Sequence, residues 1–157
     1  MATNYGAKSA DTVKSEIDKY KSWYTLIDGI FFDEMAYDDN SQYVTYYKTV
    51  SSYAKGLAKT VGNPGTDTKQ TYIGSVDTIV IYETDKGFPT ETQFGGWHKN
   101  YTLSNFAIMP YNLHTLDQNK VTEAKKFVKY IYVTDDKLPN PWDTISSYIN
   151  ELFALLN

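Results

Sequence analysis

Residues 26–34 read LIDGIFFDE, a short run that is apolar on both faces and ends in the acidic pair Asp33-Glu34. Such runs are typical of strands buried inside a parallel sheet. Helical patterns flank the run on both sides, and strands that alternate with helices indicate βαβ units. The segment therefore predicts an α/β fold with a mainly parallel sheet.

Two amphipathic helices are expected around this strand. One carries apolar residues at spacings of three and four residues, and the Asp38-Asp39-Asn40 segment is expected to form the N-cap of the other. The first helix is marked by Val13, Ile17, Tyr20 and Tyr24, and the second by Tyr43, Tyr46, Tyr47, Val50, Ala54 and Leu57. Other strands are expected at residues 1–5, 60–61, 78–82, 106–109 and 130–133, and other helices at 117–128 and 142–156.

The whole chain, residues 1–157, is expected to form one domain with about six strands. A closed (β/α)8 barrel needs ~250 residues, so a barrel of this length would lack about two βα units. A doubly wound open sheet of six strands fits the length better. The pattern alone leaves both architectures open.

Acidic residues follow three of the expected strands: Asp33 and Glu34, then Glu83, then Asp135 with Asp136. The carboxyl ends of parallel strands form the binding face in barrels and open sheets alike. Because neighbouring strand residues point to opposite sides, one residue of the Asp33-Glu34 pair should face a cleft beside Glu83. Two carboxyl groups are what glycoside hydrolysis uses, one as acid and one as base or nucleophile. Chance placement is the alternative, since strand ends are loops and loops are polar.

Composition narrows the choice of partner. Aromatic residues make up 16% of the chain, including 15 Tyr, which suits either sugar stacking or an ordinary core. The net charge is −4 and every cation is Lys, so a nucleic-acid partner is not expected. There is no Cys, no metal-ligand motif, no phosphate-binding Gly loop and no apolar run of membrane-spanning length, so we predict no metal, no cofactor and no membrane span.

Three separate motifs carry a resemblance to a known family, and they occur in the family's order. They are IDGIFFDE at residues 27–34, VGNPGT at 61–66 and YVTDDKLPNPWD at 132–143, preceded by TNYG at 3–6. These segments closely resemble the spherulation-specific (spherulin-type) family of barrel glycoside hydrolases. The resemblance spans essentially the whole chain.

The resemblance implies a (β/α)8 TIM-barrel fold and hydrolysis of an N-acetylgalactosamine-containing exopolysaccharide in microbes that make or degrade biofilm. It maps the essential acids of the family onto Asp33, Glu34 and Glu83. By the same resemblance, Tyr5, Asn63, His114 and Asp135 are expected to line the cleft. Rim aromatics that would stack on sugar rings include Tyr82 and Tyr111 as well as Tyr5, unless these rings only fill the barrel. His98 is expected on the surface.

Family members carry two further βα units and a signal peptide before the segment at residues 3–6. No signal peptide is predicted in this chain, because no basic or apolar leader precedes that segment. The prediction is therefore a barrel that lacks its first two units, extracellular by resemblance, with exposed strand edges that favour a homo-oligomer. Two alternatives remain: a non-catalytic carbohydrate-binding or cell-surface protein on the same scaffold, and an α/β protein with a small-molecule site at its strand ends.

Overall fold

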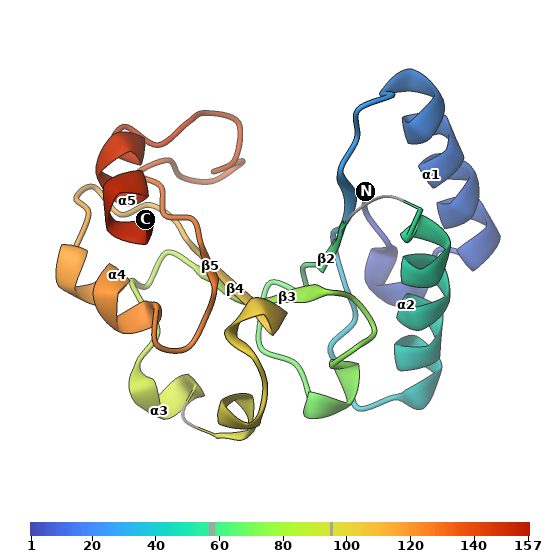
Figure 1. Cartoon of the computed structure of the whole chain (residues 1–157), viewed down its shortest axis with the longest axis horizontal. Coiled ribbons are helices and arrows are strands. Elements are labelled where there is room, and N and C mark those ends of the chain that lie inside the picture. The colour runs from blue at the N-terminus through green and yellow to red at the C-terminus, as the bar shows by residue number, and fades with distance from the viewer. Residues whose placement is uncertain (57–58, 95) are drawn as a thin grey trace. The chain divides into compact units, whose positions relative to one another are not determined.

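Strands and helices alternate along the chain in the computed structural model, which describes residues 1–56, 59–94 and 96–157 (Figure 1). The strands are β1 (Gly29–Phe32), β2 (Lys59–Gly62), β3 (Thr78–Thr84), β4 (Phe106–Pro110) and β5 (Tyr130–Ile131). The α-helices are α1 (Ala10–Trp23), α2 (Ser41–Ala54), α3 (Glu91–Phe94), α4 (Gln118–Ala124) and α5 (Ile149–Leu156). Short 3-10 helices are η1 (Asn4–Gly6), η2 (Gln70–Tyr72), η3 (Trp97–Asn100) and η4 (Leu103–Asn105).

The order of the strands in the sheet separates the two architectures that the sequence left open. The five described strands lie in chain order, β1-β2-β3-β4-β5, and β1 pairs with β2, β2 with β3 and β4 with β5 in parallel. A doubly wound sheet reverses its order at a switch point, whereas a (β/α) barrel adds each strand beside the previous one. The predicted α/β fold of (β/α)-barrel type is confirmed.

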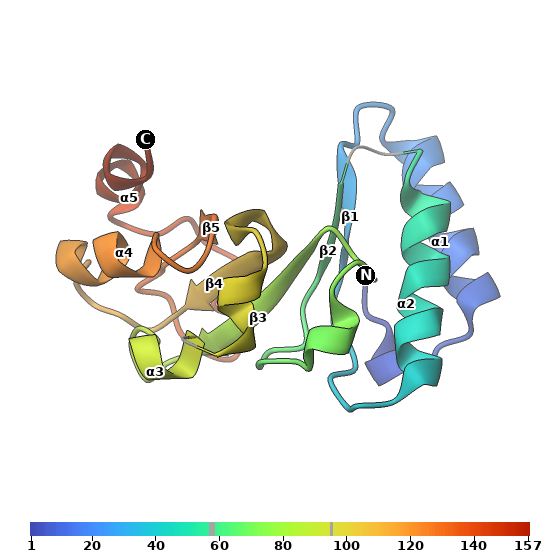
Figure 2. The same ribbon diagram turned by 60° about the horizontal axis from the view of Figure 1, so that its bottom comes forward.

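The chain forms two compact units, Met1–Ile81 and Tyr82–Asn157, and each is described by itself. In the first unit, α1 and α2 lie side by side and cover the same side of β1 and β2 (Figures 1 and 2). Ser9 caps α1 by accepting from the Thr12 N–H, and Asn40 caps α2 by accepting from the Gln42 N–H. Both helices occur where periodicity predicts them, and Asn40 confirms the expected cap; Leu57 lies outside the described residues.

The core of the first unit forms where these helices meet the strands. Its completely buried side chains include Val13 and Ile17 of α1, Tyr47 and Val50 of α2 and Phe32 of β1. In the second unit, α4 and α5 pack against each other, and the Lys125 ammonium donates to the Leu155 carbonyl. Burial of these apolar stripes positions the strand ends that carry the acids.

The segment at residues 26–34 departs from its expected burial. Ile30 and Phe32 are buried, but Phe31 is 38% exposed and Leu26 is 91% exposed. The strand therefore buries one face, against α1 and α2, and not both. The expected first strand is reduced to a parallel bridge between Ala2 and Asp33 followed by η1.

Other differences lie in the second unit. The last helix begins at Ile149 and not at Trp142, because the Ser146 and Ser147 N–H groups donate to the Tyr132 hydroxyl and the Asp135 carboxylate. The helix expected at residues 117–128 ends at Ala124, and β5 covers only Tyr130–Ile131 of the expected strand. His98 is 4% exposed and not on the surface, since its ring packs on Trp97 and Phe106.

Candidate functional site

The Asp33-Glu34 pair lies at the carboxyl end of β1 and is fixed by the segment before η1. The N–H groups of Thr3 and Tyr5 donate to the carbonyls of Asp33 and Glu34, both at 2.8 Å. The buried Thr3 hydroxyl donates to the same two carbonyls, at 3.0 and 2.8 Å. These backbone contacts place both acidic side chains at the strand end, as the sequence predicts.

The two acidic side chains have different partners. The Asp33 carboxylate accepts from the side-chain amide of Asn63 at 3.1 Å, and the Asn63 carbonyl oxygen accepts from the Gly65 N–H at 3.0 Å. The Glu34 carboxylate accepts from the Asn4 N–H at 3.2 Å. The two carboxylates are therefore held by different segments of the chain, Asp33 by the residue after β2 and Glu34 by η1.

Backbone strain gathers at the carboxyl ends of the strands. The described non-glycine residues with positive φ are Asn4 (50°), Tyr5 (51°), Glu34 (52°) and Asn112 (57°). Asn4 and Tyr5 follow the Ala2–Asp33 bridge, Glu34 follows β1 and Asn112 follows β4. Such conformations are unfavourable for residues with a side chain and concentrate at functional sites.

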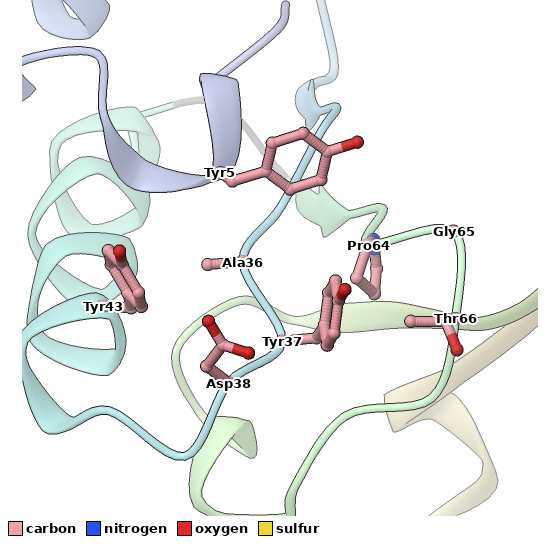
Figure 3. Close-up of a pocket in the computed structure, with 8 residues that line it drawn as sticks. All are labelled: Tyr5, Ala36, Tyr37, Asp38, Tyr43, Pro64, Gly65 and Thr66. Carbon is pink, nitrogen blue, oxygen red and sulfur yellow. The ribbon is translucent and has the colours of Figure 1, made fainter.

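A pocket of about 400 Å³ opens beside the Asp33-Glu34 pair, within the first unit. Figure 3 shows the rings of Tyr5, Tyr37 and Tyr43 around it, each from a different segment of the chain. It is lined by Tyr5, Ala36, Tyr37, Asp38, Tyr43, Pro64, Gly65 and Thr66. Tyr5 and Tyr37 are 51% and 45% exposed, so their faces are open to a ligand. The pocket has the size of a small-ligand site and combines rings with one carboxylate.

Tyr37, Asp38, Tyr43 and Thr66 were not among the site residues predicted from sequence. Tyr37 and Asp38 follow Asp33 and Glu34 in the same strand-end loop, and this proximity was the signal that could have found them. Tyr43 lies on the helical stripe of α2, so its spacing indicated a packing role and gave no sign that it lines the pocket.

In the second unit, Glu83 lies inside β3 and not after it, since that strand continues to Thr84. Tyr111 follows β4, and its N–H donates to the Thr84 carbonyl at 3.0 Å. Burial raises the pKa of Tyr111, and the negative charges of Asp85 and Glu83 raise it further. Tyr111 therefore lies near the carboxyl end of β3, and its role as a rim residue that binds sugar stays a prediction.

Two aromatic rings pack against Trp142 in this unit. The ring centroid of Tyr111 lies 5.8 Å from that of Trp142, and that of Tyr132 lies 6.0 Å from it. Tyr82 instead packs edge-on against Phe94 at 5.9 Å, so part of its ring is used in packing. Its role in sugar binding stays a prediction, as does that of His114, which is exposed after β4.

Asp135 is held in the turn that precedes α5. Hydrogen bonds from Ser147, side chain and N–H, lower the pKa of the Asp135 carboxyl group, and the N–H contact measures 3.0 Å. The Asp135 side chain thereby ties the segment after β5 to the chain before α5. Its role in substrate binding stays a prediction.

The lowered pKa of Asp135 has a consequence for stability. A carboxyl group with a depressed folded-state pKa stabilises the fold above its unfolded pKa of about 3.9, and this stabilisation is lost as pH falls through the folded-state pKa. We expect Asp135→Asn to lower the free energy of unfolding at pH 7, and the difference from wild type to shrink toward pH 3. Urea unfolding of both proteins at pH 7 and pH 3 measures these free energies. An equal difference between the variant and wild type at the two pH values would contradict the prediction.

The described residues contain no group of three or more His, Cys, Asp or Glu side chains arranged to hold a metal ion. Within the same described ranges, no helix is long and apolar enough to cross a membrane.

Comparisons with known proteins bear on both the family and the fold. The curated relative Spherulin-4 of Physarum polycephalum is 34% identical over 100 residues, which cover 62% of this chain and 29% of the relative. The match thus spans less than a third of the length of that relative. The crystal structure of Sph3 from Aspergillus clavatus in complex with GalNAc is similar to this chain with a TM-score of 0.81. Sequence identity to Sph3 is 17%, so this similarity shows the fold alone; it covers 99% of this chain and 70% of that chain.

The family model described as "Spherulation-specific family 4" matches residues 1–156. That range includes all three motifs on which the resemblance rests. The chain therefore belongs to spherulation-specific family 4.

Proposed function

We propose that this chain binds an N-acetylgalactosamine-containing polysaccharide and hydrolyses it with carboxylates at its strand ends. The observation that carries the proposal is the aromatic pocket beside the Asp33-Glu34 pair. Pyranose rings present C–H faces that pack on aromatic planes, and Tyr5 and Tyr37 offer such planes in a pocket that the Asp38 carboxylate also lines. The similarity to Sph3, whose crystal structure holds GalNAc, supports this sugar as the ligand.

The catalytic assignment rests on the chemistry of glycoside hydrolysis and on the family resemblance. One carboxyl group protonates the leaving oxygen, and the other acts as base or nucleophile. We assign these roles to Glu83 and to one member of the Asp33-Glu34 pair. Asn63 is a positioning residue, because its amide holds the Asp33 carboxylate. The reaction needs no metal or cofactor. We also propose an extracellular setting, on the family resemblance.

A non-catalytic carbohydrate-binding protein on the same scaffold is the second candidate. The pocket favours it as much as it favours an enzyme, since ring stacking serves binding with or without turnover. Release of reducing ends from a GalNAc-containing polysaccharide, measured together with binding of the same polymer, separates the two. Turnover supports the hydrolase, binding without turnover leaves the binding protein, and absence of both overturns the proposal.

Tyr37→Ala tests the pocket in either case. We expect the Kd for the polymer to rise about tenfold, the equivalent of about 1.4 kcal/mol, because one face of the sugar loses its aromatic contact. Tyr53→Ala is the matched control, since Tyr53 is 41% exposed on α2 and does not line the pocket. Equal binding by both variants would place the sugar elsewhere.

A further inference from the structure

The second unit contains another cavity, at the opposite end of its strands from Tyr111. It measures about 160 Å³ and is lined by Phe94, His98, Lys99, Tyr101, Leu103, Lys126 and Phe127. Leu103 begins η4, which leads directly into β4, and Lys126 and Phe127 precede β5. The Lys129 N–H joins these segments by donating to the Leu103 carbonyl at 2.9 Å. The cavity therefore lies at the amino ends of β4 and β5.

The walls of this cavity are built from packed rings. His98 is 4% exposed, and its ring centroid lies 3.9 Å from that of Trp97, 5.4 Å from Phe94 and 5.2 Å from Phe106. Because it packs against three rings, the His98 side chain is held in one orientation. The cavity is thus a preformed hollow with mainly aromatic walls, which is the usual construction of a small-ligand site.

Two lysines line this cavity, and the lining residues include no Asp or Glu. Lys99 and Lys126 are both exposed, and neither forms an ion pair with a described residue. The nearest acid along the chain before Lys126 is Glu123, which pairs with Lys120 at 3.5 Å. In a chain of net charge −4, two lysines at one aromatic cavity make a local site for a negative group.

We propose that this cavity binds a small ligand in which a carboxylate is attached to one six-membered ring that presents an apolar face. Its volume is close to that of a cavity of about 150 Å³ that accepts benzene, so a single ring fits. The aromatic walls would take the ring and the two ammonium groups the carboxylate. A uronic acid residue and a free aromatic carboxylate share this chemistry. Exposed lysine–carboxylate pairs alone are weak, so acetate, which lacks the ring, should not bind measurably.

The test is calorimetric titration of the full chain with galacturonate and with benzoate. Galactose and benzyl alcohol serve as neutral counterparts and acetate as the ringless anion. We expect one of the two ring carboxylates to bind, and its affinity to fall at least about tenfold in Lys99→Met/Lys126→Met, which removes both charges but keeps the aliphatic stems. Raising the salt concentration should weaken binding as well. The probe that binds identifies the source of the carboxylate.

The control variant is Lys19→Met/Lys48→Met, which removes two exposed charges from α1 and α2 of the other unit. It should bind as wild type does. The proposal is overturned if neither ring carboxylate binds at millimolar concentration, if the neutral counterparts bind equally well, or if the control loses as much affinity. Because no turnover is measured, these outcomes do not depend on whether the chain hydrolyses polysaccharide.

Discussion

Glu34→Gln and Glu83→Gln are each expected to lower reducing-end release from a GalNAc-containing polysaccharide by about 10²–10⁴-fold. The amide keeps the shape of the carboxyl group but cannot transfer a proton or attack the sugar. In Glu34→Gln the amide oxygen can still accept from the Asn4 N–H, so the positive-φ backbone at this position keeps its support. Initial rates at saturating polymer, with the free energy of unfolding measured in parallel, give the effect.

Glu151→Gln is the matched control, since Glu151 lies in the first turn of α5 and is exposed. It should leave the rate unchanged, and all three variants should unfold within about 0.5 kcal/mol of wild type. Full activity in both Glu34→Gln and Glu83→Gln would refute the assignment of these acids. If only Glu34→Gln stays active, Asp33→Asn becomes the decisive variant, because Asp33 is the other carboxylate at the end of β1.

Periodicity predicted the two long helices of the first unit well because burial decides where they form. The stripe that contains Val13 and Ile17 points into a completely buried core, and α1 forms where that stripe runs. The position of Asp33 and Glu34 directly after β1 was predicted by the same reasoning, since a charged pair that ends an apolar strand lies at a strand end whatever the rest of the fold. Here local sequence and tertiary packing favour the same structure.

The second unit was harder to predict because its elements depend on contacts that are distant in sequence. Residues 142–148 carry a helical apolar pattern, yet Ser146 and Ser147 donate to Tyr132 and Asp135 and no helix forms there. The helix α3 has four residues, too few to show a period, and His98 gives no sign in the sequence that three rings bury it. A periodic sequence pattern indicates burial that repeats along an element, but it does not indicate a single contact between distant residues.

The residues of the pocket in the first unit were also hard to predict, because they meet through contacts between distant parts of the sequence. Tyr37 and Tyr43 become neighbours only through the path of the loop between β1 and α2. The Tyr47 hydroxyl is one buried point that holds this path, since it accepts from the Ala36 N–H at 2.9 Å and contacts the Thr3 hydroxyl at 2.9 Å. The Tyr72 hydroxyl also holds the loop, by donating to the Asp38 carbonyl at 2.9 Å. Since the Thr3 hydroxyl donates to backbone carbonyls, Tyr47 is the donor in their contact. One side chain of α2 thus ties down the residues before Tyr5 and Tyr37.

Tyr47→Phe is therefore expected to lower the free energy of unfolding by about 1–3 kcal/mol, because the buried Ala36 N–H loses its acceptor. Tyr53→Phe is the matched control on the same helix: its hydroxyl donates to the exposed Asp18, and its loss should cost less than about 0.5 kcal/mol. Combining Tyr47→Phe with Thr3→Val should cost less than the sum of the two single changes, because both remove the same contact. Urea unfolding of the four variants and of wild type measures all of this. If Tyr47→Phe and Tyr53→Phe cost the same, the Tyr47 hydroxyl does not hold the loop, and the loop is then held by its other contacts, such as the hydrogen bond from the Tyr72 hydroxyl to the Asp38 carbonyl.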